Sequence, residues 1–171
     1  DGKGTLISLK DESMENALVS GIAFQKDQVK FTLHGVGDIP GTAFKILGPI
    51  SDAEIEVDVI VQNVSVDGKT DFTFTVSSED QDAVKNVLED IKNEVNYREL
   101  IVDSDIAKVS LVGVGMRSQA GVASKAFKAL SENNVNIQII CTSEIKITMV
   151  IDEELIDKTV SILHKEFELE K

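Results

Sequence analysis

One stretch of the chain decides its fold: Lys30-Phe31-Thr32-Leu33-His34-Gly35-Val36-Gly37-Asp38-Ile39-Pro40-Gly41-Thr42-Ala43-Phe44. It alternates like a β-strand, breaks at glycines and a proline, and then takes on helical spacing. A second version begins as Lys108-Val109-Ser110-Leu111-Val112-Gly113-Val114-Gly115 and reaches a helix start at Gly121. The sequence therefore predicts the same strand, loop and helix start twice.

The two copies keep a constant register. Matching residues lie 78 positions apart from Lys30 to Gly37, and 80 apart after the loop, where Gly41 matches Gly121 and Ile55 matches Val135. A register shared by a strand, a helix and a further strand indicates an internal repeat.

The elements of the first unit follow the order β-α-β-β-α-β. Pro40 suits the first position of a helix, which Asp38 could cap and which Gly48-Pro49 should kink or shorten. Ser77 or Ser78 could cap the second helix, whose apolar residues run from Val84 to Val95. Strands are expected at 29–33, 55–61, 71–76 and 97–102.

The second unit repeats this order but lacks its last strand. Strands are expected at 108–114, 135–141 and 146–151, and helices from Gly121 and from Ile156 to Phe167. Residues 168–171 are too few for another strand, whereas residues 17–24 form a spare apolar segment, followed by a polar turn at 25–28.

We therefore predict an α+β fold of two ferredoxin-like βαββαβ units, with the first nested in the second. Residues 28–102 would form the first unit, residues 17–27 with 103–171 the second, and residues 1–16 an N-terminal arm or linker. Nesting is favoured because an unpaired edge strand is a liability. The alternative is that residues 17–24 simply extend the first sheet.

Composition excludes several classes of protein. The 171 residues are 42% hydrophobic and 27% charged, which is a globular balance. A net charge of −13 argues against nucleic acid and anionic membrane surfaces as partners. A single cysteine, Cys141, rules out an internal disulfide, and we expect a cytoplasmic protein.

Catalytic patterns are missing from the sequence. The glycines at 35, 37 and 41 do not fit the G-x-G-x-x-G dinucleotide spacing. His34 and His164 have no metal-ligand spacing, so His34 is expected at a strand end and His164 on a solvated helix flank. Cys141 is expected to be a small core residue. We predict no catalytic residue, no metal and no cofactor in this chain.

A polar ring at matched places of the two units suggests a small ligand. In the first unit, the helix start after Asp38 would offer N–H groups to a carboxylate, Asp38 could pair with an ammonium, and Gln62-Asn63 end the neighbouring strand. This set of groups suits a free amino acid. The alternative is that these are ordinary loop residues.

The motifs resemble the paired ACT domains of aspartate kinase, in its regulatory β-subunit or C-terminal region. The likeness extends from Leu18 to the C-terminus and rests on five runs in order: Gly-Val-Gly-Asp-Ile-Pro-Gly at 35–41, Val-Gln-Asn-Val-Ser at 61–65, Lys-Val-Ser-Leu-Val-Gly-Val-Gly-Met at 108–116, Val-Asn-Ile-Gln at 135–138 and Thr-Ser-Glu-Ile-Lys at 142–146.

The resemblance implies a regulatory function. The chain would bind threonine, lysine or both and inhibit the ATP-dependent phosphorylation of aspartate in lysine, threonine and methionine biosynthesis. The partners would be a second copy of the chain and a kinase catalytic domain or α-subunit, which alone would use ATP. The implied effector-binding residues are Asp38, Ile39, Gly41, Thr42, Ala43, Gln62, Asn63, Met116, Gly121, Val122, Ala123, Asn134, Asn136, Ile137 and Ser143.

Two positions depart from the family pattern. Ala123 stands where relatives under lysine-plus-threonine control often have Thr, which leaves lysine sensitivity at the second site open. Thr42 stands where many relatives have Glu. An ACT-type regulatory subunit of another amino-acid biosynthetic enzyme, or a scaffold that binds no ligand, are the alternatives.

Overall fold

The computed structural model describes residues 19–63, 67–114 and 121–169. Within them, the backbone forms one antiparallel sheet of six strands in the order β2-β3-β1-β4-β6-β5. The strands are β1 (Gly21–Gly37), β2 (Ile60–Gln62), β3 (Lys69–Ser77), β4 (Glu99–Val112), β5 (Ile139–Thr142) and β6 (Lys146–Asp152). The helices are α1 (Thr42–Asp52), α2 (Gln81–Asp90), α3 (Lys92–Val95), α4 (Val122–Glu132) and α5 (Ile156–Glu166), with 3-10 turns η1 (Ser78–Asp80) and η2 (Glu153–Leu155).

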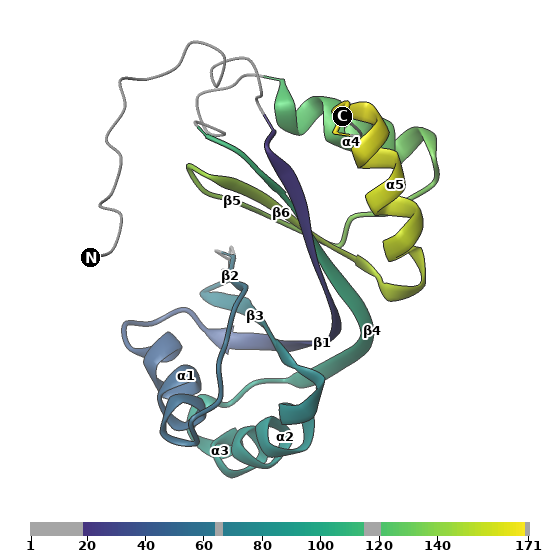
Figure 1. Ribbon diagram of the computed structural model, residues 1–171. Coiled ribbons are helices and arrows are strands. Elements are labelled where there is room, and N and C mark those ends of the chain that lie inside the picture. Colours follow the sequence, from purple (N-terminus) through teal and green to yellow (C-terminus); the bar gives the residue numbers. More distant parts are fainter. Residues whose placement is uncertain (1–18, 64–66, 115–120, 170–171) are drawn as a thin grey trace, which may run out of the picture.

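Two long strands, β1 and β4, run through both halves of the sheet. Figure 1 shows the sheet bending along them, with α1, α2 and α3 against one half and α4 and α5 against the other. β1 pairs with β4 from Gly21 to His34, and its second half also pairs with β3. The two halves of the molecule are therefore joined by shared strands rather than by a linker.

Each half has its own hydrophobic core. We call the half with α1, α2 and α3 the first unit and the half with α4 and α5 the second unit. The core of the first unit includes Phe31 and Phe74, whose rings stack with their centroids 5.5 Å apart. The second unit is packed around residues that include Val109, Leu130 and Met149. From Val29 to Leu33 in β1, and from Val109 to Val112 in β4, buried positions alternate with partly exposed ones, with the period of two that a half-covered sheet requires.

The internal repeat is visible in the backbone. α1 and α4 are both 11 residues long and start after Gly41 and Gly121, which have φ of 95° and 105°. Glycine suits this left-handed conformation because it carries no Cβ. Glu54 and Asn134, also 80 positions apart, have φ of 59° and 56° just after each helix. The matched helix starts and ends show that the two units share one folding plan.

The predicted fold class is confirmed. Residues at the start of β1 pair with the second unit's part of β4, from Gly21 opposite Val112 to Gln25 opposite Lys108. The first unit is thus nested within the second. The precise unit boundaries stay a prediction, and the arm predicted at 1–16 lies outside the described residues.

The prediction of separate strands around these boundaries was wrong. Residues 17–24, 25–28 and 29–33 were expected as strand, turn and strand, but Gly21–Gly37 is one strand with register shifts between Gln25 and Lys30. Asp27 takes a φ of 57° there. Irregular pairing of this kind absorbs extra residues without ending a strand. In the same way, the strands expected at 97–102 and 108–114 are one strand, Glu99–Val112, because β1 pairs along its length.

The first helix also differs from the prediction. Pro40 lies before the helix, whose N-cap residue is Gly41, and no side chain caps it, Asp38 included. The helix continues through Pro49 to Asp52 rather than ending there. Ile46 and Ile50 are fully buried on one face of this helix, and their burial outweighs the backbone hydrogen bond that proline cannot donate.

Several shorter corrections concern the remaining elements. The strands expected at 55–61 and 135–141 are shorter, at Ile60–Gln62 and Ile139–Thr142, although Ile55 and Val59 are still buried. The helix expected up to Val95 is divided at Ile91. No serine side chain caps it. Cys141 is exposed on the edge strand β5, so its assignment to the core was wrong.

Candidate functional site

The corner between β1 and α1 is built on a bulge in β1. The pairing of β1 with β3 shifts between Leu33 and Val36, where Gly35 has a φ of 72°. Asp71 on β3 holds this bulge, since the Gly35 N–H donates to its Oδ1 at 3.0 Å and His34 Nδ1 lies 2.9 Å from its Oδ2. The Gly35 hydrogen bond lowers the pKa of Asp71, with His34 adding to this effect and burial opposing it. Asp71 therefore acts as an ionised anchor for the start of the loop.

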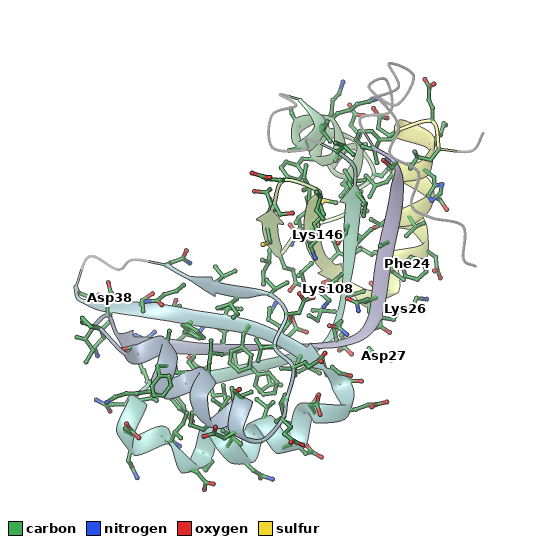
Figure 2. All side chains as sticks on the ribbon, turned by 60° about the vertical axis from the view of Figure 1, so that its left-hand side comes forward. Phe24, Lys26, Asp27, Asp38, Lys108 and Lys146 are labelled. Atoms are coloured by element: carbon green, nitrogen blue, oxygen red, sulfur yellow. The ribbon has the colours of Figure 1, made fainter. Side chains whose placement is uncertain are left out.

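Asp38 and Gln62 meet at the open end of this corner. Gln62 Nε2 donates to Asp38 Oδ1 across 3.4 Å, and the Asp38 N–H donates to Gly68 O at 2.9 Å. Asp38 lies at the outer end of the first unit in Figure 2. Beside it, the side chain of Ile39 is 62% exposed. The corner thus presents a carboxylate, an amide and an apolar side chain to solvent.

The helix start supplies backbone N–H groups next to these side chains. The first N–H groups of any α-helix have no partner within the helix, and they favour a negative group. Thr42 is buried and donates its hydroxyl to Gly37 O at 2.8 Å, so its side chain fastens the loop instead of facing solvent. Ala43 is exposed next to it. The Thr42 N–H itself donates to Ile39 O at 3.2 Å. The arrangement therefore places the Asp38 carboxylate close to the helix turn that holds the next N–H groups, those of Ala43 and Phe44.

The second unit has a related but different corner. Gly121 is exposed, Val122 is buried and Ala123 is half-buried at the start of α4. The Gly113 N–H donates to the backbone Ile145 O at 2.9 Å, whereas the matching Gly35 donates to a side chain. Met116 lies outside the described residues.

Ser143 closes the turn between β5 and β6, where its Oγ accepts from the Lys146 N–H at 3.1 Å. Asn134 and Asn136 are exposed just after the C-terminal end of α4, and Ile137 packs against the second core. An 11-residue helix is about 16 Å long, so these residues lie at the opposite end of α4 from Gly121.

The structure therefore brings together only part of the predicted site. Asp38, Ile39, Gly41, Ala43 and Gln62 share one corner, and Asn63 follows Gln62 in an exposed position. Asn134 and Asn136 belong to a different region of the same chain. If both groups contact one ligand, two chains must contribute to it.

Sequence reasoning missed Asp71 as the anchor of the bulge. Asp71 is one of the polar positions in the apolar-polar alternation of β3, and only its charge sets it apart from the other polar residues of that strand. Its contact with Gly35 depends on a bulge that the sequence pattern does not reveal. Among the described side chains, no group of three His, Cys, Asp or Glu residues is arranged to hold a metal ion. In the same residues, every helix is too short or too polar to cross a membrane.

Comparisons with known proteins agree with the repeat. A family described as ACT domain matches residues 33–96, and a second family of the same description matches residues 109–167. The chain is 56% identical over 171 residues to an aspartate kinase of Pseudomonas fluorescens (strain SBW25), covering 99% of this chain and 41% of that protein. It thus spans about two fifths of the length of the curated relatives it matches.

Two solved structures have the same fold as this chain. A crystal structure of aspartokinase alpha and beta subunits superposes with a TM-score of 0.82 at 45% identity, covering 88% of this chain and 99% of that chain. The ligand-free regulatory subunit of aspartate kinase from Thermus thermophilus superposes with a TM-score of 0.83 at 34% identity, with the same coverage of 88% and 99%.

Proposed function

We propose a function from one premise: the chain belongs to the aspartate kinase family, as the paired ACT domains of its regulatory region. The proposed function is to bind end-product amino acids, threonine or lysine or both, and thereby to inhibit aspartate phosphorylation. ATP and aspartate would bind to a kinase catalytic domain or α-subunit, not to this chain.

The contact between Asp38 and Gln62 carries this proposal. A free amino acid has one ammonium and one carboxylate. Asp38 offers an exposed carboxylate to the ammonium, and the N-terminus of α1 offers N–H donors to the carboxylate. The side chain of Ile39 would lie against the effector's own side chain. No other chemistry is required for such a ligand to be recognised.

A second copy of the chain would complete the site. Among the residues that the structure describes, β2 and β5 are the outer strands of the sheet, so each has an edge without a partner strand there. Their side chains Ile60 and Ile140 are 46% and 48% exposed, which is costly for isolated edges in water. Joining sheets from two chains would cover these edges and bring Asn134 and Asn136 of one chain to the Asp38 corner of the other.

Inhibition would follow from differential affinity. An effector that binds one arrangement of the dimer better than another shifts the population toward that arrangement, by no more than the difference in binding free energy. The kinase partner would then be held in the less active arrangement. Ala123 and the backbone-anchored corner of the second unit suggest that the two corners differ in what they bind.

A thermal-shift screen tests the proposed function. Threonine, lysine, methionine, and threonine with lysine are each added to the chain, with D-threonine as a stereochemical control. A ligand that binds only the folded state increases the free energy of unfolding by RT ln(1 + [L]/Kd), and it must therefore raise the melting temperature. We expect threonine, lysine or their mixture to raise it. A chain whose melting temperature is unchanged by all of them would be a scaffold, and the proposal would be wrong.

A further inference from the structure

The two lysines that begin the repeated motif, Lys30 and Lys108, have no place in the effector corner. Their neighbours Phe31 and Val109 point into the two cores, and successive side chains of a strand point to opposite faces. Both lysines therefore lie on the face of the sheet opposite the cores, which we call the open face. Lys108 is 4% exposed, which is unusual for a lysine and requires a charged partner. The partner comes from the other unit.

Lys108 reaches from the second unit to the first. Its Nζ donates to Asp58 Oδ2, which stands in the segment before β2. The Asp58 N–H donates to Thr75 O at 3.1 Å, so the partner carboxylate is fixed to the first unit's own sheet. Figure 2 places Lys108 where the two halves of the sheet meet, far from Asp38.

Lys30 reaches in the opposite direction. Its Nζ donates to Gln138 Oε1, in the segment before β5, and lies 3.0 Å from Asp103 Oδ2 on β4. Gln138 Nε2 in turn donates to Asp152 Oδ1 at 2.7 Å, and the Gln138 N–H donates to Val150 O at 2.8 Å. The lysine of the first unit is thus bound to the second.

The two contacts are copies of each other. Lys108 follows Lys30 by 78 positions, and Gln138 follows Asp58 by 80, which are the two offsets of the repeat. The backbone acceptors Thr75 and Val150 also hold equivalent places on β3 and β6. Each unit therefore extends the same lysine to the same position of the other unit. We call this pair of contacts the reciprocal lysine bridges.

We propose that the reciprocal lysine bridges fix the angle between the two units and couple their effector corners. β1 and β4 continue through both units, and a bent pair of strands can change its bend without breaking a hydrogen bond. Contacts across the open face resist that change. The coupling part of this proposal rests on the proposed function, whereas the fixed angle does not.

Methionine is the suitable replacement for each lysine, since it keeps most of the apolar stem and removes the charged end. The double variant Lys30→Met with Lys108→Met is compared with Lys69→Met with Lys146→Met, which removes two exposed lysines, one from each unit. The two variants have the same net charge. Single Lys30→Met and Lys108→Met variants serve if the double variant does not fold.

Distances between spin labels measure the angle directly. Labels are placed on Asn86→Cys in α2 and Ser124→Cys in α4, both exposed, with Cys141→Ser to remove the native thiol. Labelled chains are diluted with unlabelled ones so that only distances within a chain contribute. We expect the bridge variant to shift or broaden the distance distribution and the control variant to keep that of the parent. An unchanged distribution in the bridge variants would overturn the proposal.

Calorimetry then measures coupling. Threonine affinity is measured with and without lysine in the parent and in both double variants. The coupling is the ratio of the threonine affinity with lysine to that without lysine, and allosteric coupling commonly makes such a ratio about 5- to 150-fold. We expect this ratio to move toward one in the bridge variant and to stay at the parent's value in the control variant. A shifted distance with an undiminished ratio would overturn the coupling. If no amino acid binds the parent, the proposed function fails, and the distances still decide whether the bridges fix the angle.

Discussion

Replacing Asp71 by Asn should loosen the bulge in β1 that starts the loop before α1. The substitution keeps the side chain's size but removes the charge that accepts from the Gly35 N–H at 3.0 Å and faces His34 Nδ1 at 2.9 Å. A hydrogen bond to a charged group contributes about 1.5–3 kcal/mol, but the Asp71 side chain is 47% exposed, so water screens part of this. Asn can still accept one hydrogen bond. We expect a loss of about 1 kcal/mol, or about 2–4 °C in melting temperature.

The pH dependence of this loss follows from the lowered pKa of Asp71. A carboxyl whose pKa is lower in the folded state stabilises the fold above its unfolded pKa, which is about 3.9 for Asp. That stabilisation disappears as the pH falls through the folded pKa. The difference in stability between the parent and Asp71→Asn should therefore be full at pH 7 and should shrink below about pH 4.

Urea unfolding at pH 7 and at about pH 3 measures both quantities. Glu56→Gln, which removes one exposed negative charge elsewhere in the first unit, is the control and should change stability little. If Asp71→Asn were as stable as the control at pH 7, or if its deficit were the same at both pH values, Asp71 would not be an ionised anchor.

Two further predictions concern the helix start and the buried lysine. Gly41→Ala should cost about 1–2 kcal/mol, because Gly41 has a φ of 95°, whereas Gly37→Ala, where a Cβ also meets nothing within 4 Å but φ is not positive, should cost less than about 0.5 kcal/mol; equal losses in thermal unfolding would disprove the role of φ. Asp58→Ala should lower the free energy of unfolding by about 2 kcal/mol or more, because it leaves the Lys108 charge buried without its partner. Lys108→Met removes that charge and should lower it by about 1 kcal/mol or less. If urea unfolding gave the opposite order, the pair would not be a buried charge with an exposed partner.

The repeat could be predicted from the sequence because it rests on local signals. Gly41 and Gly121 mark helix starts, and the constant offsets link them to apolar alternation in the flanking strands. The need for a last strand in the second unit led to the nested topology. These signals depend on backbone conformation and on burial, both of which leave regular patterns in a sequence.

The continuity of β1 and β4 could not be predicted because it depends on pairing between distant segments. Residues 25–28 are polar and are typical of a turn, yet Gln25 and Gln28 both pair with β4, which keeps the chain extended. Helix α1 is a similar case, since Ile46 and Ile50 pack into a core that outweighs the local effect of Pro49. Tertiary contacts decided both cases.

The sequence proposed the residues of the candidate site, whereas only the structure shows which of them lie together. The sequence singled out Asp38 and Gln62, and in the structure Gln62 Nε2 lies 3.4 Å from Asp38 Oδ1. It also buries Thr42 and Val122, and it separates Asn134 and Asn136 from the helix starts. Spacing alone does not show which side chain of a loop faces inward, nor which residues would share the site that we propose a second copy completes.

Calorimetric titration of Asp38→Ala with the amino acid that the thermal screen identifies tests the central claim most directly. Loss of a charged partner for the ligand's ammonium, at about 1.5–3 kcal/mol, should weaken binding about 10- to 150-fold. Asp38 is exposed, so the variant should unfold at the parent's temperature. Glu56→Ala, another exposed acid of the first unit, should bind like the parent. An unchanged affinity in Asp38→Ala would contradict the assignment of the effector site to the corner between β1 and α1.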